Sequence, residues 1–504
     1  MKNLGASFFR NIYFRYAILG ILLLLGLYFY ILRKNNIAEK LSTVMQTINP
    51  TTEEIIDAYQ PLSSRDITKA ITKAADAQQK WELLSFQKRA SIIKKVAMML
   101  RKRKDEYAVM IVQSMGKPIT EAKEEIEKCA KLCDYYVEHG NAFLATDTVE
   151  TAQEVIHQSY EPLGVIFAVM PWNFPFWQVF RFAIPNLIGG NTGLLKHASN
   201  VVNIGKAIEN IFLEAGCPEG VFQTLVISSS QTIQVIQDER VAGVTLTGSE
   251  RAGSAVAATA GKSLKPVVLE LGGNDPCIIY PDADLDLAIQ KCVQSRCSNT
   301  GQVCIAAKRI ILIGDIRDIF IEKLLAHVKK YYLHGDPMLE TTKIGPMARA
   351  DLRDTIHQQV TQTIAAGATC LVGGHPIPGK GFFYPVTILT NIPNKSPAYQ
   401  EELFGPIICI FHVADEKEAI ALANDTRYGL AATIFTSHME RATAVALTKI
   451  RTGTCYINDL VVSDQRLPFG GIKKSGYGRE LGKEGIRSFM NRKVVVIKKK
   501  VHTN

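Results

Sequence analysis

Three side chains that could form a nucleophilic catalytic site are spread through the chain: Cys304, Glu270 and Asn173. Cys304 lies in the uncharged stretch "SNTGQVCIAAKR", and it would act as a nucleophile only where a cation, backbone dipoles or a base favour the thiolate. Glu270, in "LELGGN", ends a predicted buried strand, a place that carboxylates avoid unless they are paired or used. Asn173, in the predicted loop "WNFPFW", could donate its amide to an oxyanion. Each residue type also has a structural explanation, such as an inert core thiol or a turn asparagine.

The stretch "TLTGSERAG" is a candidate phosphate-binding turn. It places Gly248, Ser249 and Gly253 after an apolar strand and at the start of a helix, where free N–H groups and the helix dipole attract phosphate. The spacing differs from the usual G-x-G-x-x-G, and a tight strand-to-helix connection explains these glycines equally well.

Alternating helices and strands are predicted to position these residues. Residues 64–136 are rich in Ala, Lys, Glu, Gln and Met at helical spacing and predict a helical layer. Two series of short apolar runs follow, and their alternation with helical stretches predicts doubly wound parallel sheets. The first series is "GVIFAVMPW", "TGLLKHA", "FQTLVIS" and "VAGVTLTGS"; the second is "PVVLELGG", "PCIIYP", "KRIILIG", "TCLVGG" and "TGTCYIND". Gly272 and Gly273 mark the expected boundary between the two units.

The composition indicates a globular protein with two or three domains and a large core: 504 residues, 47% of them hydrophobic and 21% charged. The net charge is +10, but the basic residues gather at the termini, so we predict no nucleic-acid partner. The ten cysteines form no paired framework, which indicates a reducing compartment, and their spacing predicts no metal site.

The N-terminal extension, residues 1–44, contains an uncharged run from Tyr16 to Leu32 between Arg15 and Arg33. With aromatic residues at both ends and no cleavage site after it, the run predicts an uncleaved transmembrane helix over about residues 13–33. The protein would then be membrane-anchored, with its catalytic body in the cytosol. The alternative is a soluble cytoplasmic protein whose translation starts at Met45.

Six separated stretches are similar to those of NAD(P)-dependent aldehyde dehydrogenases, over about residues 45–497. They are "PWNFP", "TGS", "ELGG", "GQVC", "EELFGP" and "PFGGIKKSGYGRELG". The resemblance implies that Cys304 is the nucleophile, that Glu270 activates the water that hydrolyses the thioester, and that Asn173 holds the oxyanion with the backbone N–H of Cys304. It also implies two Rossmann-like domains and a small β oligomerisation element.

The resemblance implies further site residues. A dinucleotide, NAD or NADP, would contact Trp172, Lys196, Ser199, Gly248, Ser249, Leu271, Glu402 and Phe404, and Glu480 would lie on a proton path or be an ordinary charge at a helix start. Many relatives have a glutamate at the position of Ser199, where it holds the 2′-hydroxyl. Its absence here leaves the choice between the two cofactors open.

The details most resemble bacterial succinate-semialdehyde dehydrogenases, which implies oxidation of succinic semialdehyde to succinate. Arg181 matches an arginine that grips the substrate carboxylate. A second such arginine is Ser298 in this chain, and Ser463 or Arg466 could take its place. The alternatives are a dehydrogenase of fatty or other lipid-derived aldehydes, which the membrane run favours, and a catalytically silent protein on the same fold.

The expected domain organisation follows from the same resemblance. Residues 45–145 and 161–272 would bind NAD(P), residues 273–470 would form the catalytic domain, and residues 146–160 and 485–500 would form the oligomerisation element. We expect a homo-oligomer, either a dimer or a tetramer, in which residues 148–159 and the apolar terminal strand "KVVVI" pair across subunits.

Overall fold

The structure is a computed structural model that describes residues 44–499. The predicted transmembrane segment, residues 13–33, lies outside this range, as does most of the extension that precedes Met45. None of the helices built from residues 44–499 is long and apolar enough to cross a membrane.

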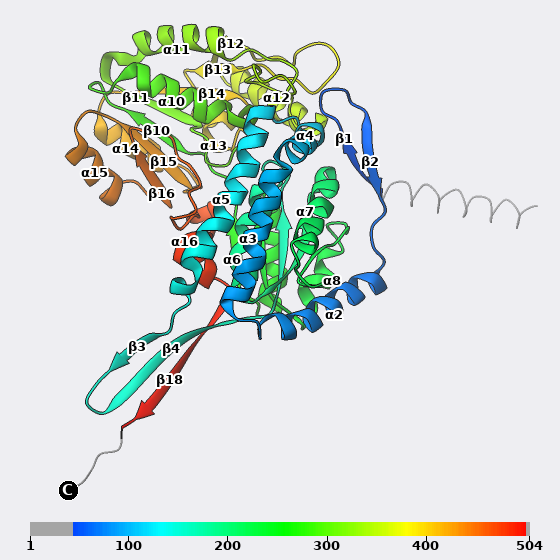
Figure 1. Cartoon of the computed structure of the whole chain (residues 1–504). Helices are drawn as coiled ribbons and strands as arrows, with labels where there is room; N and C mark the ends of the chain where they lie inside the picture. Colours follow the sequence, from blue (N-terminus) through cyan, green and yellow to red (C-terminus); the bar gives the residue numbers. More distant parts are fainter. Residues whose placement is uncertain (1–43, 500–504) are drawn as a thin grey trace, which may run out of the picture.

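A hairpin and a layer of helices begin the described chain, as the spacing of residues 64–136 predicts (Figure 1). Serine hydroxyls cap two of the helices: Ser63 accepts from the N–H of Asp66, and Ser85 accepts from that of Lys88. The helix α5 packs against α3, α4 and α6. The elements are β1 Met45–Ile48, β2 Ile55–Tyr59, α2 Ser64–Trp81, α3 Phe86–Lys102, α4 Lys104–Met115 and α5 Ile119–Phe143.

A six-stranded sheet forms the first α/β unit, in the order β17-β9-β8-β5-β6-β7. Its strands are parallel except β17, which pairs antiparallel with β9. The strand β9, in the stretch "PVVLELGG", belongs to this first sheet, so its predicted place in the second series of strands is wrong. The elements are β5 Val165–Met170, α6 Trp177–Gly189, β6 Thr192–His197, η1 Ser199–Val201, α7 Val202–Glu214, β7 Phe222–Thr224, α8 Thr232–Gln237, β8 Val241–Thr247, α9 Glu250–Lys262, β9 Val267–Glu270 and β17 Gly476–Tyr477.

A seven-stranded sheet forms the second unit, in the order β12-β13-β14-β11-β10-β15-β16, with only β12 antiparallel to its neighbour. The chain passes from the first sheet to the second between β9 and β10, which is where Gly272 and Gly273 lie. The strands are β10 Pro276–Ile279, β11 Arg309–Ile313, β12 Thr369–Val372, β13 Thr387–Thr390, β14 Ile407–Val413, β15 Ala431–Phe435 and β16 Thr454–Ile457. The helices that follow β9 along the chain are α10 Leu285–Cys297, η2 Ser298–Gly301, η3 Gly314–Ile316, α11 Arg317–Tyr331, α12 Ala350–Ala365, α13 Pro397–Gln400, α14 Glu416–Asn424, α15 Met439–Thr448, η4 Lys473–Ser475 and α16 Gly482–Arg487. The last of them, α16, packs against α5 and α6.

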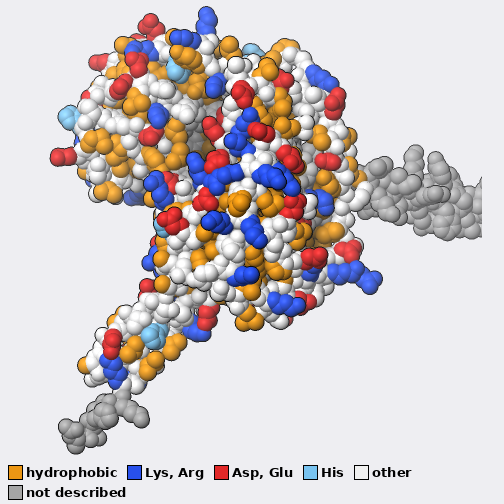
Figure 2. All heavy atoms as spheres, viewed as in Figure 1, with side chains coloured by type: hydrophobic (Ala, Val, Ile, Leu, Met, Phe, Trp, Pro, Cys, Tyr) orange, Lys and Arg blue, Asp and Glu red, His pale blue; other side chains and the backbone are white. Residues whose placement is uncertain are grey.

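A three-stranded antiparallel sheet, β18-β4-β3, extends from the body as an arm (Figure 1). Its strands are β3 Asp147–Glu150, β4 Glu154–Pro162 and β18 Met490–Lys498. The terminal strand pairs with β4 of the same chain along its whole length, from Met490 opposite Pro162 to Lys498 opposite Glu154. Apolar side chains on the arm are exposed (Figure 2), among them Val494 and Ile497. Assembly through this arm stays a prediction, as do the domain boundaries.

Candidate active site

Cys304 lies on the wall of a cavity of about 270 Å³ between the helical layer and the loops of the second sheet. Much of the wall is apolar, with Phe174, Trp177, Ile305 and Phe469 among its members. Because such a wall limits access of water, polar groups that do face the cavity interact strongly with whatever occupies it. The polar side chains that matter below are Lys128, Arg181, Ser298 and Ser463.

The loop before Cys304 is held in a strained conformation. Asn299 and Thr300 both have left-handed backbone angles, with φ of 50° and 55°. Such angles are unfavourable for a β-branched residue, and they persist only where the surroundings fix them. Here the Asn299 amide donates to the carbonyl of Asn173 at 2.8 Å, and the Thr300 hydroxyl donates to that of Gly345 at 3.2 Å. The strain therefore belongs to a loop that is braced on two sides.

The thiol of Cys304 is held in its protonated form by its surroundings. Burial raises its pKa to about 11, while the cations Lys308 and Arg181 oppose that rise. Lys308 also donates to the carbonyl oxygens of Val303 at 3.1 Å and of Cys304 at 2.5 Å. The nucleophile therefore needs to lose a proton when substrate arrives, since only the thiolate attacks.

Asn173 lies beside this loop. One hydrogen of its amide Nδ2 donates to the carbonyl oxygen of Gln302 at 3.0 Å. An amide nitrogen carries two hydrogens, so a second donor is available for an oxyanion near Cys304. The structure thus brings Asn173 and Cys304 together across 131 positions of sequence, from the loop after β5 and the loop after α10.

Glu270, at the end of β9, is buried and has no hydrogen-bond partner for either carboxylate oxygen among residues 44–499. Its side chain lies against Gly470, where an added Cβ would be 2.6 Å from Oε1. Burial raises its pKa well above the usual range and Glu480 adds to the rise, against the opposing charges of Arg181 and Arg479. A carboxylate in such a place has the properties of a general base.

Arg181 faces the cavity, but its guanidinium is already engaged. Its Nε forms an ion pair with Glu480, its Nη2 donates to the Thr247 hydroxyl at 3.3 Å, and its guanidinium carbon lies 4.6 Å from the ring centroid of Phe469. Burial raises the pKa of Glu480, and the charge of Arg181 lowers it. Arg181 can therefore offer a substrate only part of its donor set.

The two proposed substitutes for the missing second arginine are placed very differently. Ser463 is buried on the cavity wall, and its hydroxyl has no hydrogen-bond partner within the described chain. Arg466 is 69% exposed and binds Asp464 at 2.6 Å, away from the cavity. Arg466 is therefore not among the residues that line this cavity, because the neighbouring carboxylate at i−2 holds the guanidinium at the surface, and its role in substrate binding stays a prediction.

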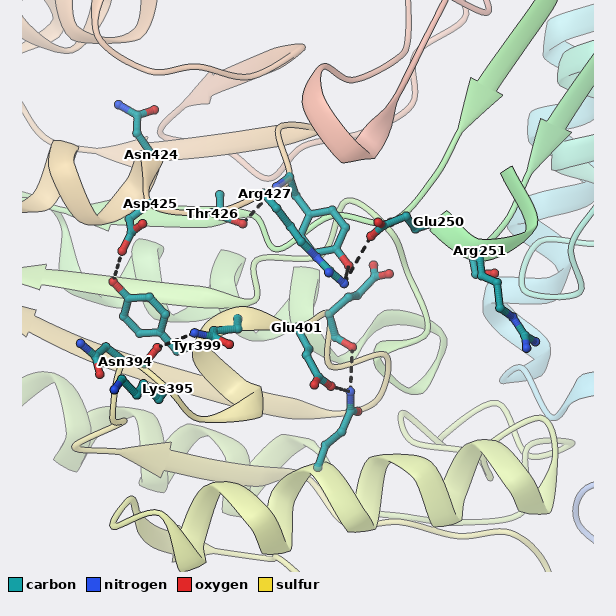
Figure 3. A pocket seen from close by; sticks show the side chains of 16 residues that line it. Glu250, Arg251, Asn394, Lys395, Tyr399, Glu401, Asn424, Asp425, Thr426 and Arg427 are labelled. Carbon is teal, nitrogen blue, oxygen red and sulfur yellow. Dashed lines mark hydrogen bonds and ion pairs between the residues drawn. The ribbon is translucent and has the colours of Figure 1, made fainter. Parts of the chain in front are cut away.

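A second, larger cavity of about 840 Å³ lies beside the start of α9 (Figure 3). Ser249 caps this helix by accepting from the N–H of Ala252 at 3.3 Å, and Glu250 and Arg427 point toward one another at 3.3 Å. Glu402 accepts from the N–H of Gly273 at 3.1 Å and pairs with Lys308 at 3.2 Å.

Most of the other predicted cofactor residues lie toward the carboxyl ends of strands of the first sheet, while Phe404 precedes β14 of the second sheet. The rings of Trp172 and Phe404 meet edge to face, with centroids 5.9 Å apart. Lys196 is buried, which lowers its pKa, and it donates to the carbonyl of His197 at 3.3 Å. Ser199 is exposed at the start of η1. Gly248 donates to the carbonyl of Glu270 at 2.9 Å, and Leu271 is buried against Gly253 of α9.

Several residues of the site were missed by the sequence analysis. Asn299 and Lys308 flank Cys304 and hold its loop, and the stretch "SNTG" contained a signal for the first, since asparagine tolerates left-handed angles. Lys128 was not predicted because an isolated lysine on an amphipathic helix reads as a surface charge. No group of three or more His, Cys, Asp or Glu within residues 44–499 is arranged to hold a metal ion.

The chain belongs to the aldehyde dehydrogenase family, whose model matches residues 37–495. The chain is 45% identical over 451 residues to a probable NADP(+) succinate-semialdehyde dehydrogenase of Synechocystis, covering 90% of this chain and 99% of that protein. It is also 45% identical, over 88% of this chain and 96% of the relative, to the succinate semialdehyde dehydrogenase Sad of Escherichia coli, which is named for NAD(P)+.

A solved structure agrees with these sequence relatives. Succinic semialdehyde dehydrogenase from Streptococcus pyogenes, in complex with NADP+, superimposes with a TM-score of 0.88 at 40% identity, covering 90% of this chain and all of that one. The prediction of an aldehyde dehydrogenase fold is thereby confirmed.

Proposed function

We propose that this protein oxidises succinic semialdehyde to succinate with NADP or NAD as the oxidant. The observation that carries the proposal is the lining of the Cys304 cavity. Its wall contains the thiol of Cys304, the guanidinium of Arg181 and the buried hydroxyl of Ser463, which has no hydrogen-bond partner among residues 44–499. A four-carbon aldehyde with a terminal carboxylate matches this lining, because the thiol can react with the aldehyde carbon while the arginine and the hydroxyl bind the carboxylate. The names of the relatives support the same substrate.

The residues of the larger cavity fit a dinucleotide. The N-terminus of α9 with Gly248 and Ser249 suits phosphate, and the carboxylate of Glu402 suits a ribose hydroxyl. Trp172, Phe404 and Leu271 would supply apolar contacts. When bound, the nicotinamide accepts a hydride from the substrate carbon.

The side chains of the smaller cavity would perform the acyl chemistry. The thiolate of Cys304 attacks the aldehyde carbon, and the new oxyanion accepts hydrogen bonds from the free amide hydrogen of Asn173 and the N–H of Cys304. Once the carbon is oxidised to the thioester, Glu270 takes a proton from water, the water oxygen bonds to the acyl carbon, and the carbon–sulfur bond breaks. Glu480, paired with Arg181, would accept the proton that Glu270 passes on.

Substrate preference tests the proposal directly. We expect kcat/KM for succinic semialdehyde to exceed that for butanal by about 10- to 100-fold, because one or two charge-assisted hydrogen bonds of about 1.5–3 kcal/mol are made only with the acid. Absorbance of the reduced cofactor measures both rates, and hexadecanal in the same series tests the lipid-aldehyde alternative. An equal or higher value for either neutral aldehyde contradicts the proposed substrate, and no turnover of any aldehyde would favour a silent protein.

The side chain at position 199 is expected to decide cofactor choice. Ser199→Glu should raise KM for NADP by about tenfold or more and leave KM for NAD unchanged or lower, because the new carboxylate repels a 2′-phosphate and can hold a 2′-hydroxyl. Ser199→Gln is the matched neutral control, with the same size and no charge. If both variants change KM for NADP equally, then size and not charge acts at this position.

A further inference from the structure

Lys128 of α5 presents an unpaired ammonium group to the substrate cavity. The residue lines the same cavity as Cys304, Arg181 and Ser463. Its Nζ lies 4.2 Å from the ring centroid of Trp177, on the neighbouring helix α6. Within the part of the chain that the structure describes, this nitrogen has neither a hydrogen bond nor an ion pair. The cation–π contact with Trp177 is the interaction found for its charge.

Among residues 44–499, none of the acidic groups near Lys128 forms an ion pair with it. Glu124, one turn earlier on α5, lines the same cavity and is exposed to solvent. Glu125 pairs with Lys117 and accepts from the backbone N–H groups of Phe176 and Trp177, at 2.8 and 2.9 Å. Asp464 is held by Arg466 at 2.6 Å.

Glu121 lies further along the same wall and is satisfied as well. It accepts from the hydroxyl of Ser298 at 2.9 Å and from the N–H of Asn299 at 2.7 Å. Ser298, which stands where relatives have a second carboxylate-binding arginine, is therefore committed to bracing the nucleophile loop.

The surroundings of Lys128 disfavour its charge. Burial, helped by the nearby charge of Arg181, lowers its pKa to about 8. Lys128 is partly buried, and a cation that is partly removed from water without a partner is unfavourable, so an anion placed beside it would offset that cost. The cavity thus holds a positive charge that forms no ion pair with a carboxylate of residues 44–499.

We propose that Lys128 binds the carboxylate of the aldehyde substrate and takes the part of the arginine that Ser298 replaces. The second cation of the carboxylate site is then a residue of α5, and not one at the end of α10, where Ser298 lies. Arg181, whose Nε is paired with Glu480, contributes its remaining N–H donors. The ligand class is a short aldehyde with a terminal carboxylate. This inference rests on the proposed function.

The test separates carboxylate binding from folding and from chemistry. Lys128→Met keeps an unbranched side chain, one atom shorter, and removes its charge. We expect KM for succinic semialdehyde to rise by about 10- to 100-fold with kcat changed by less than about threefold, and kinetics with butanal to stay within about twofold. Lys128→Arg should restore most of the affinity for succinic semialdehyde.

Lys131→Met is the matched control, because it removes one positive charge from an exposed position of the same helix. It should leave both substrates unchanged. If the wild-type protein prefers succinic semialdehyde and Lys128→Met leaves its KM within twofold, or raises KM for butanal equally, this inference is overturned and the proposed function stands. If the wild-type protein shows no preference for succinic semialdehyde, the proposed function itself fails.

Discussion

Cys304→Ala is expected to lower kcat/KM for succinic semialdehyde by roughly 10⁴-fold or more, to the limit of detection. The effect is large because the proposed mechanism passes through a thiohemiacetal and a thioester, and both need a thiol. Of the three partly exposed cysteines, Cys304, Cys370 and Cys455, only Cys304 lines that cavity. The measurement is the rate at which reduced cofactor appears with the purified variant.

The matched control is Cys370→Ala, which removes a partly exposed thiol from β12, at the edge of the second sheet. Its activity should equal that of the wild-type protein. A Cys304→Ala variant that kept more than about one tenth of the activity would exclude covalent catalysis by this thiol, whichever aldehyde is used.

Glu270→Gln is expected to slow steady-state turnover by about 10²- to 10⁴-fold while leaving the first turnover fast. The amide fills the same space but cannot take a proton from water, so the thioester on Cys304 persists. Two measurements together report this: a burst of about one equivalent of reduced cofactor per subunit, and an acyl adduct in the intact mass of the protein.

The pH profile gives an independent readout of the same group. The pKa of Glu270 is raised by burial, and a general base acts only when ionised, so hydrolysis by the wild-type protein should rise as pH rises through that elevated pKa. The Gln variant should lack this limb. Glu484→Gln, at an exposed position of α16, is the control and should keep the wild-type profile. A slow Glu270→Gln variant that accumulates no acyl adduct would contradict the role.

Much of the fold could be predicted from sequence because short apolar runs bounded by glycine mark buried parallel strands. Two strands that were not predicted, β14 and β17, show where this pattern fails. In β14, residues 407–411 are buried without interruption, and an apolar run of that kind has no period that separates a strand from a buried helix. The strand β17 has only two residues, and its pairing with β9 depends on a chain segment about 200 positions away.

The site also contains residues that could be predicted from sequence and residues that could not. The nucleophile, base and amide were predicted from motifs, and the structure brings Asn173 to the loop of Cys304, while their roles stay predictions. Charges, in contrast, depend on partners that sequence does not show. Arg466 could not be separated from a ligand-binding arginine until its ion pair with Asp464 was seen, and Lys128 could not be separated from a solvated lysine until its position on the cavity wall was seen.

The placement of the last strands has a consequence for the order in which the protein is made. The carboxylate of Glu270 ends a strand whose outer edge is covered by Gly476 and Tyr477, and the long strand β4 pairs with residues 490–498. The ribosome must therefore have passed residue 476 before the first of these edges can close, and residue 490 before the second. Until then the first α/β unit has strands with unpaired edges, and such edges are sites of aggregation. The strand that ends at Glu270 thus gains its outer neighbour only after about 200 further residues have been synthesised.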